Sequence, residues 1–489
     1  MNPISVLITI AIYFAILFLV SYLAGRKADN EGFFVGNRKS AWYVVAFAMI
    51  GSSISGVTYV SVPGMVATNG FAYLQMVLGF VAGQFIIAFV LVPLFYRMNL
   101  VSVYEYLGNR FGISSYKTGA WFFFLSKMLG AAVRLFLVCL TLQLLVFNPL
   151  GLPFILNVVA TVALVWLYTF RGGVKSLIWT DSLKTFCLIV SVILCIYYIA
   201  SDLHVSLSGM IKTITDSDLS RLFFFDDVND KRFFFKQFFA GVFTMIAMTG
   251  LDQDMMQRNL SCKNFKDSQK NMITSGISQF FIILLFLMLG VLLYTYAGQS
   301  GLFTPQDIAA GSIKSDEVFP MIAVGSYFPV IVGVLFIVGL ISSAYAAAGS
   351  ALTALTTSFT VDVLGIKNKG EAEIVKIRKR VHIGMAAVMG LVIVIFNLLN
   401  NTSVIDAVYI LASYTYGPIL GLFAFGIFMK TQVRDRYIPL VAIVSPILCF
   451  ILQRNSKAWF GGYEFSYELL IFNALFTFVG LWLLAVRKK

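Results

Sequence analysis

Long apolar segments fill almost the whole chain, and short polar segments separate them. A helix needs about 20 mostly apolar residues to cross a bilayer. Thirteen segments meet this requirement, at about residues 4–24, 43–66, 71–96, 118–146, 152–170, 176–200, 235–256, 272–298, 319–362, 381–400, 404–430, 437–453 and 465–486. The pattern therefore predicts an all-α polytopic membrane protein with about thirteen transmembrane helices.

Composition supports this prediction. Of the 489 residues, 59% are hydrophobic and 12% are charged, whereas a soluble domain is roughly 25% charged. The longest loop, about residues 201–234, is too short for a soluble catalytic domain. The chain has two histidines and five cysteines, with no CxxC pair. We therefore expect no enzyme activity and no cofactor, sodium apart.

The basic residues predict the orientation in the membrane. With the N-terminus outside, 25 of the 36 Lys and Arg residues lie in or beside the inner loops, and eight lie in or beside the outer ones. Such an excess is what the positive-inside rule requires. We therefore expect a multi-pass protein of the cell membrane with its N-terminus outside and its C-terminus inside. The net charge of +13 then reflects topology, so no nucleic-acid partner is expected.

Three basic residues remain inside apolar segments: Lys127, Arg134 and Lys184. Ionisable groups at membrane depth are costly and often mark a solute pathway. Arg134 could hold a carboxylate through both its nitrogens, or it could be a structural tie to backbone carbonyls or an acid. Lys127 lies two helical turns away on the same face and nearer the inner end, which favours snorkelling to the surface.

Two apolar segments contain small or polar interruptions. The second carries Gly51-Ser52-Ser53-Ile54-Ser55-Gly56-Val57-Thr58 and then Pro63-Gly64, and the seventh carries Thr249-Gly250-Leu251-Asp252-Gln253-Asp254. Such interruptions free backbone groups that must face protein or a cavity, and in many transporters they form the ion and solute site. The alternative is close helix packing through small residues. The two interruptions are five segments apart, as an inverted five-plus-five repeat would place them.

Four motifs in order resemble the sodium:solute symporter family. They are Ile54-Ser55-Gly56 to Pro63-Gly64, Gly172-Gly173-Val174 leading to Trp179-Thr180-Asp181, Asp252-Gln253 to Gln257-Arg258, and the small-residue ninth segment ending at Asp362. The resemblance implies one LeuT-like transmembrane domain over residues 1–489. Its core repeats would cover about 43–200 and 235–430, with peripheral helices at about 4–24, 437–453 and 465–486. It also implies alternating access.

Within the family, the sialic acid transporters are the most similar guide to the solute site. Their substrate-contacting residues correspond here to Ser53, Ser55, Thr58 and Arg134, with Gln75 as a further candidate. An arginine in the fourth span implies a carboxylated solute, such as a sugar acid of the sialic acid type. The alternatives are an ordinary sodium-coupled carrier of a sugar or another solute and, in a different class, a membrane receptor or channel.

The sodium site implied by the resemblance is incomplete. Its backbone carbonyls would come from Gly51, Ile54 and Ser343. The two positions that should supply hydroxyls are Ala346 and Ala347, which have no side-chain oxygen for a hard cation. A second sodium would use Asp181 and hydroxyls near Ala346, where Ser350 keeps one. A shift of four residues, which would use Ser342 and Ser343 instead, would restore the site.

Lys184 stands where the family usually has glutamine, three residues after Asp181. The two side chains share a helix face and can meet. One hypothesis is that the Lys184 ammonium replaces the sodium charge, permanently or by titration. The alternative is a plain ion pair with Asp181. Sodium coupling is therefore expected to be lost or altered.

Overall fold

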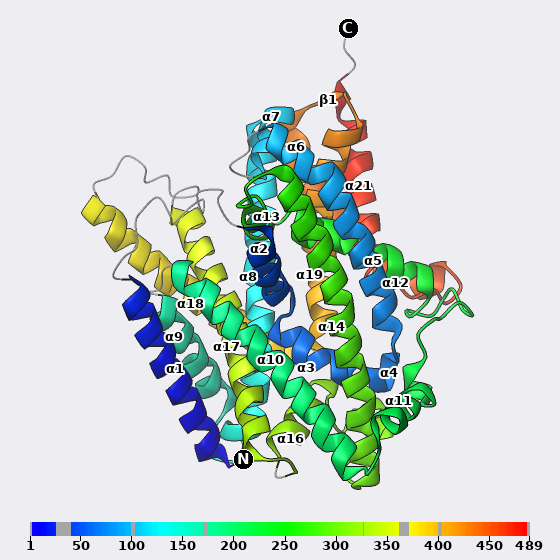
Figure 1. Ribbon diagram of the computed structural model, residues 1–489. Coiled ribbons are helices and arrows are strands. Elements are labelled where there is room, and N and C mark those ends of the chain that lie inside the picture. The colour runs from blue at the N-terminus through cyan, green and yellow to red at the C-terminus, as the bar shows by residue number, and fades with distance from the viewer. Residues whose placement is uncertain are drawn as a thin grey trace.

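The computed structural model describes residues 2–25, 41–98, 103–169, 174–325, 327–360, 371–399 and 403–486. These residues form a tall bundle of helices, with α1 starting at one end and α21 finishing at the other (Figure 1). The two ends of the chain therefore lie on opposite faces of the bundle, as an odd number of crossings requires.

The first half of the chain forms helices α1 to α11. Their bounds, with the π and 3-10 turns (η) between them, are α1 Pro3–Gly25, α2 Trp42–Ser53, α3 Gly56–Gly64, α4 Val66–Asn69, α5 Ala72–Ile86, η3 Ile87–Leu91, α6 Val92–Arg97, α7 Glu105–Arg110, α8 Ile113–Leu142, η4 Gln143–Phe147, α9 Phe154–Thr169, α10 Val174–Asp202, α11 Leu207–Thr215 and η5 Asp218–Ser220.

The second half begins after the long loop. Its elements are α12 Phe234–Met245, η6 Ile246–Gly250, α13 Gln253–Asn259, α14 Phe265–Gln299, α15 Pro305–Ala309, η7 Ser315–Glu317, α16 Val318–Val324, α17 Val330–Ser358, α18 Glu371–Leu399, α19 Val404–Phe428, β1 Gln432–Val433, η10 Asp435–Tyr437, α20 Ile438–Trp459, α21 Leu469–Leu483 and β2 Ala485–Val486. The two short strands pair antiparallel and join the loop after α19 to the segment after α21.

Length and composition identify seven helices in the described part of the chain that could cross a bilayer, or nine if each of two bent pairs is one span. Four shorter apolar helices of 10–17 residues accompany them. The polytopic helical prediction is confirmed, whereas the count of thirteen stays a prediction.

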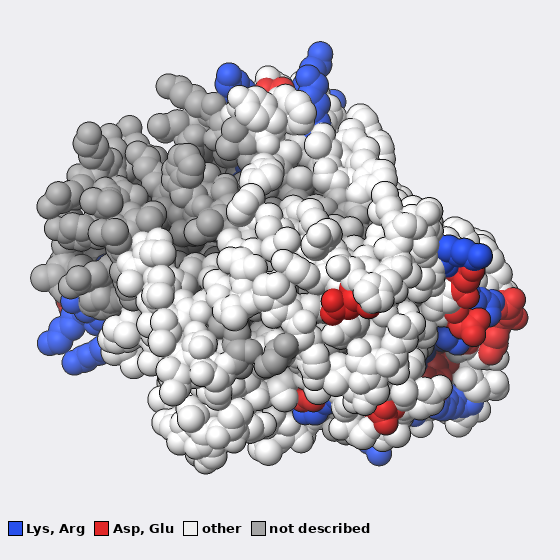
Figure 2. Space-filling model, turned by 60° about the horizontal axis from the view of Figure 1, so that its bottom comes forward, with Lys and Arg blue, Asp and Glu red and all other residues white. Residues whose placement is uncertain are grey.

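Apolar side chains cover much of the outer surface of the bundle. Ile12, Phe89, Phe281, Leu391 and Phe450 are each more than half exposed. In Figure 2 the charged side chains gather toward the edges of a broad uncharged surface. A surface of this kind is stable against lipid tails and unstable against water.

The predicted interruption in the second span is a real break. Helix α2 ends at Ser53 and α3 begins at Gly56, and the helix axes differ by 53°. The Ser55 N–H donates to the Ser53 carbonyl at 3.1 Å, and the Thr58 N–H donates to Ser55 Oγ at 3.4 Å. In a continuous helix these two N–H groups would bond the carbonyls of Gly51 and Ile54. Both carbonyls thus lose their usual helical partner.

The seventh span breaks in the same way. The π turn η6 ends at Gly250, Asp252 is extended, and α13 starts at Gln253. The Asp252 side chain caps α13 by accepting a hydrogen bond from the Met255 N–H at 3.0 Å. Asp is among the preferred capping residues because its carboxylate accepts an otherwise unpaired helical N–H. Both interruptions in the apolar pattern therefore correspond to helix breaks.

Glycines fix the N-terminal half of the seventh span, α12, against the third span, α5. A Cβ on Gly79 of α5 would lie 2.1 Å from the Phe238 carbonyl oxygen, and one on Gly241 of α12 would lie 2.1 Å from the Met76 carbonyl oxygen. The two backbones are thus in direct contact, and any larger residue would force them apart. This contact sets the position of η6 and of the break that follows it.

Candidate solute-binding site

A pocket lies between the two breaks, beside helices α8, α17 and α19. Its cavity volume is about 100 Å³, below the roughly 300–1,000 Å³ that is usual for small-molecule sites. The residues that line it are Ser55, Ser126, Lys127, Gly130, Ala131, Arg134, Met248, Asp252, Asp254, Met255, Arg258, Ser343, Ala347, Ser350, Ala351, Val408, Leu411, Ala412, Thr415 and Tyr416.

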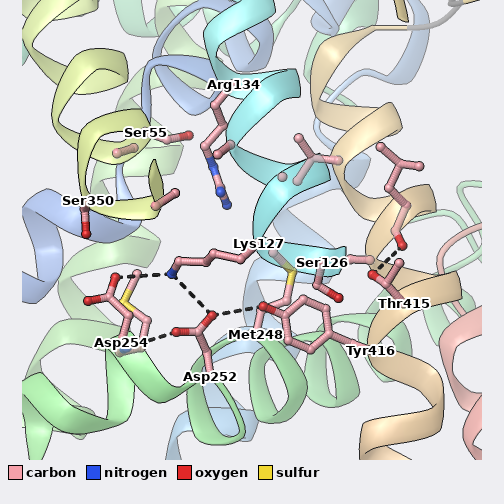
Figure 3. A pocket seen from close by; sticks show the side chains of 18 of the residues that line it. Ser55, Ser126, Lys127, Arg134, Met248, Asp252, Asp254, Ser350, Thr415 and Tyr416 are labelled. Atoms are coloured by element: carbon pink, nitrogen blue, oxygen red, sulfur yellow. Dashed lines mark hydrogen bonds and ion pairs between the residues drawn. The ribbon is translucent and has the colours of Figure 1, made fainter. Parts of the chain in front are cut away.

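Arg134 lies at one end of this pocket. Its side chain leaves α8 and points into the space between the helices (Figure 3). The guanidinium makes no hydrogen bond or ion pair with any residue that the structure describes. The tie to an acid considered as an alternative role for Arg134 therefore has no counterpart among these residues. A buried cation needs a partner, so this end of the pocket is suited to an anion.

Lys127, two turns away, has partners. Its Nζ lies 3.2 Å from Asp254 Oδ2 and 3.6 Å from Asp252 Oδ2, and its side chain is 14% exposed. The prediction that Lys127 snorkels to the inner surface is therefore wrong. Two carboxylates at the break of the seventh span are nearer than the surface, and ion pairing satisfies the ammonium at that depth.

The two aspartates are further tied to the protein. The Tyr416 hydroxyl donates to Asp252 Oδ2 at 2.9 Å, and Arg258 Nε donates to Asp254 Oδ1 at 3.4 Å. Sequence reasoning treated these acids as part of a family motif and as a helix break, not as pocket residues. Acidic residues inside an apolar segment were the signal that could have indicated a pocket role.

The charges that line the pocket do not balance. They are the cations Lys127, Arg134 and Arg258 and the acids Asp252 and Asp254, a formal total of +1 when all are ionised. Both acids contact Lys127, and Asp254 also contacts Arg258. The positive charge that is left over is that of Arg134, which has no acidic partner among the described residues.

The other predicted solute contacts separate into two groups. Ser55 lines the pocket, and its Oγ also caps α3. Ser53 and Thr58 do not line it, and Thr58 is 7% exposed. Gln75 is fully buried elsewhere, where its Nε2 donates to the Arg232 carbonyl at 2.8 Å and its Oε1 accepts from the Phe224 N–H at 3.2 Å. In this structure Gln75 fastens the long loop to α5.

Three of the predicted ion-site positions on α17 line the pocket beside the first break. Ser343, Ala347 and Ser350 of α17 line the pocket together with Ser55. Ser343 Oγ is fully buried and makes no hydrogen bond with a described residue. It lies 3.6 Å from where a Cβ on Gly56 would stand. By contrast, the Ser342 hydroxyl donates to the Gly339 carbonyl at 3.1 Å.

Three predicted positions cannot be placed in this way. The side chains of Asp181, Lys184 and Ala346 lie outside the described residues. The hypothesis that Lys184 replaces a sodium ion therefore stays a prediction.

The exposure of the pocket-lining charges differs from residue to residue. Asp254 and Arg258 are 29% and 28% exposed, whereas the Asp252 side chain is 5% exposed. Three tyrosines that do not line the pocket pack together next to its lining residue Val408: the hydroxyls of Tyr73 and Tyr409 share a hydrogen bond at 2.7 Å, and the Tyr409 ring lies 5.2 Å from that of Tyr467.

The model of the sodium:solute symporter family matches residues 33–434. This chain belongs to the sodium:solute symporter family. Membership identifies a secondary transporter in a membrane, with a small solute as its partner, and not an enzyme. The sequence resemblance to the family is thereby confirmed.

Individual relatives agree with the family. The sodium/sialic acid symporter NanT of Aliivibrio fischeri is 25% identical over 446 residues, which cover 89% of this chain and 85% of the relative. The human sodium/iodide cotransporter is 24% identical over 437 residues, which cover 85% of this chain and 65% of the cotransporter.

A solved structure confirms the fold. The substrate-bound, outward-open structure of a Na+-coupled sialic acid symporter matches with a TM-score of 0.78 and 20% identity, over 99% of both chains. The predicted fold class, a LeuT-like helical transporter, is therefore correct. The break in each half of the bundle is the part of this architecture that forms the pocket.

Proposed function

We propose that this symporter carries a carboxylated solute, a sugar acid such as sialic acid, by alternating access. The observation that carries the proposal is the Arg134 guanidinium, which lines the pocket and has no acidic partner among the described residues. A planar guanidinium holds a carboxylate through two parallel hydrogen bonds. The solute would supply the negative charge that the pocket lacks.

The relatives support an anionic solute. One is named for sialic acid and another for iodide, and both solutes are anions. The matching structure is also that of a sialic acid symporter. We give sialic acid priority over small inorganic anions because hydrogen-bonding groups line the pocket well beyond Arg134.

We further propose that sodium is a co-substrate with weakened binding at the first break. The Gly51 and Ile54 carbonyls, which lose their helical partners there, and the unpartnered Ser343 hydroxyl are suitable oxygen ligands. Ala347 contributes no oxygen, so the site has fewer ligands than the family pattern implies. Fewer ligands predict a lower sodium affinity.

The deciding experiment is uptake of radiolabelled sialic acid into proteoliposomes, with and without an inward sodium gradient. Saturable uptake with counterflow would identify a carrier, and Arg134→Ala should reduce it to background while the purified protein keeps its melting temperature. Arg134→Lys keeps the charge without the bidentate geometry and serves as the matched control, with partial activity expected. Unchanged affinity in Arg134→Ala would refute the carboxylate role.

The dependence of uptake on sodium in the same experiment tests the proposed sodium site. Uptake that rises with sodium and saturates only at high concentration would support a weak site at the first break. Uptake that is indifferent to sodium would point to an ion-independent or proton-coupled carrier, the case in which Lys184 replaces the ion.

We propose that the protein lies in the cell membrane with its N-terminus and the 201–234 loop outside. The five cysteines are all buried, so a single introduced cysteine can be labelled selectively. Val228→Cys in the loop, where the side chain is 56% exposed, should react with a membrane-impermeant maleimide on intact cells. Tyr437→Cys, 47% exposed on the opposite face, should react only after lysis. The reverse pattern would overturn this orientation.

A further inference from the structure

The pocket has a second polar end, which the family resemblance does not assign to the solute. We call it the Lys127 cluster, and it consists of Ser126, Lys127, Asp252, Asp254 and Tyr416, all of which line the pocket (Figure 3). Lys127 and Arg134 are seven residues apart on α8, so at 1.5 Å per residue their backbones are separated by about 10 Å along the helix. The Arg134 side chain extends back toward Lys127, with its Nη1 3.4 Å from where a Cβ on Gly130 would stand. A solute bound to the guanidinium can therefore also touch the Lys127 cluster.

The cluster has unused hydrogen-bonding capacity. The Lys127 ammonium has three N–H donors; one donates to Asp254 Oδ2 at 3.2 Å, and Asp252 Oδ2 is an ion-pair partner at 3.6 Å. Ser126 Oγ is buried and makes no hydrogen bond with a described residue. Asp254 is 29% exposed. A buried hydroxyl without a partner is destabilising unless a ligand or water completes it.

The charges of the cluster decide which chemical group it accepts. The two acids are matched by Lys127 and by Arg258, whose Nε bonds Asp254 Oδ1. A balanced cluster exerts little net attraction on a further ion. It does offer neighbouring donors and acceptors, which suit the hydroxyl groups of a sugar because a hydroxyl can donate and accept at once.

We infer that the solute is held at both ends, with its carboxylate on Arg134 and its hydroxyl-bearing end on the Lys127 cluster through Ser126, Lys127 and Asp254. This inference rests on the proposed function and narrows it. The cluster selects polyhydroxylated acids, whereas a short monocarboxylate has few groups that can bond to it. Arg134 sets affinity for any carboxylate, and the Lys127 cluster sets the preference among carboxylates.

The test compares two probes on the purified full-length protein. Calorimetric titration gives Kd for sialic acid and, by competition, for lactate, which has the carboxylate but not the polyhydroxyl chain. Ser126→Ala removes the unpartnered hydroxyl and no charge. It should weaken sialic acid binding about threefold to tenfold, the effect of one neutral hydrogen bond, and change lactate binding less than twofold.

Thr141→Val is the matched control. Thr141 is also a buried residue of α8 whose hydroxyl has no hydrogen bond with a described residue, and it does not line the pocket. It should leave both affinities unchanged. Asp254→Asn, a second variant at the partly exposed side of the cluster, should also weaken sialic acid more than lactate, with size-exclusion profiles and melting temperatures checking the fold.

The outcomes separate the two proposals. If Arg134→Ala abolishes both affinities but Ser126→Ala and Asp254→Asn leave their ratio unchanged, the two-ended inference is refuted and the carboxylate proposal stands. Equal weakening of both probes by Ser126→Ala would mean a general distortion of the pocket and would also refute it. If the wild-type protein binds neither probe, the proposed function fails and the inference fails with it.

Discussion

The two broken helices share one cap geometry and differ in the chemistry of the cap. At the first break Ser55 Oγ accepts the Thr58 N–H at 3.4 Å, and at the second break Asp252 accepts the Met255 N–H at 3.0 Å. The hydroxyl cap carries no charge and leaves backbone carbonyls nearby. The carboxylate cap carries a charge and holds the protein's own cation, Lys127, at 3.6 Å.

The two breaks therefore differ in where their cation comes from. At the second break the acids already have cationic partners within the chain, so no ion from solution is needed there. At the first break the freed carbonyls and the unpartnered Ser343 hydroxyl have no such partner among the described residues. The first break is therefore suited to a diffusible cation, and the second is a permanent part of the pocket wall.

The largest effect is expected from Asp252→Ala. The change removes the cap of α13, the acceptor of the Tyr416 hydroxyl and one partner of the buried Lys127. Loss of a buried charge partner should cost about 3 kcal/mol of unfolding free energy, and uptake should fall at least tenfold. Asp252→Asn keeps a capping oxygen but not the charge, so it should recover only the part of the stability that comes from the cap, and not the transport. Equal transport in the two variants and the wild type would contradict the assigned role.

Asp316 should make the stability of the folded protein depend on pH. It lies in η7, outside the spans, where Oδ2 accepts from the Val404 N–H at 2.9 Å and Oδ1 has no hydrogen bond with a described residue. Burial raises its pKa from 3.8 to about 6, although Ser61 and the Val404 N–H act in the opposite direction and the nearby acids Asp406 and Glu317 add to the rise.

The sign follows from proton binding. Between pH 3.8 and about 6 the folded protein holds the Asp316 proton and the unfolded chain does not, so stability should fall as pH rises through this window and level off above it. The loss is on the order of 3 kcal/mol. Melting temperatures of the detergent-solubilised protein from pH 4.5 to 7.5 measure it. Asp316→Asn should flatten the profile and Glu317→Gln should not; an unchanged slope in Asp316→Asn would rule out this residue as the source.

A smaller effect is expected from Ser343→Ala. Removing a buried hydroxyl that has no protein partner should hardly change the melting temperature, but it should raise the sodium concentration for half-maximal uptake by about tenfold or less, since one oxygen ligand is lost. Ser342→Ala, whose hydroxyl bonds the Gly339 carbonyl, is the matched control and should leave the sodium dependence unchanged. Identical sodium curves for all three proteins would place the ion elsewhere.

The smallest measurable loss of stability is expected from Ser55→Ala, which removes the cap of α3 and one hydroxyl of the pocket lining. Loss of a hydroxyl cap costs about 1 kcal/mol, so the melting temperature should fall by a few degrees. Ser53→Ala, two residues earlier and outside the pocket lining, should change it less. A drop as large as that of Asp252→Ala would show that the two caps contribute equally, contrary to the comparison above.

Much of the architecture could be predicted because it depends on local pattern. Apolar segments long enough for a bilayer predicted the helices, and glycine, serine and aspartate within them predicted the breaks at Ile54-Ser55 and Leu251-Asp252. Arg134 was found for a similar reason, since an arginine at membrane depth needs a function. Each of these signals lies within a few residues of the feature it predicts.

The identity of partners could not be predicted in this way. Lys127 was assigned to the surface because it lies nearer the inner end of its predicted span, but the acid that binds it is 127 residues away. Gln75 was assigned to the solute, although its amide holds a loop segment about 150 residues later in the chain. Side-chain chemistry indicated in both cases that a partner was needed, without indicating which one.

The sequence by itself determined that this protein lies in lipid, where its helices form and where two of them break. It also indicated that Arg134 needs a partner. Hydropathy, helix-breaking residues and the cost of a cation inside the membrane are properties of the chain and can be read without the fold. Only the tertiary structure decided that Lys127 would be paired with acids. The second break brings two carboxylates to Lys127, whereas Arg134 has no acidic partner among the residues that the structure describes, so Arg134 is the cation that can bind a solute.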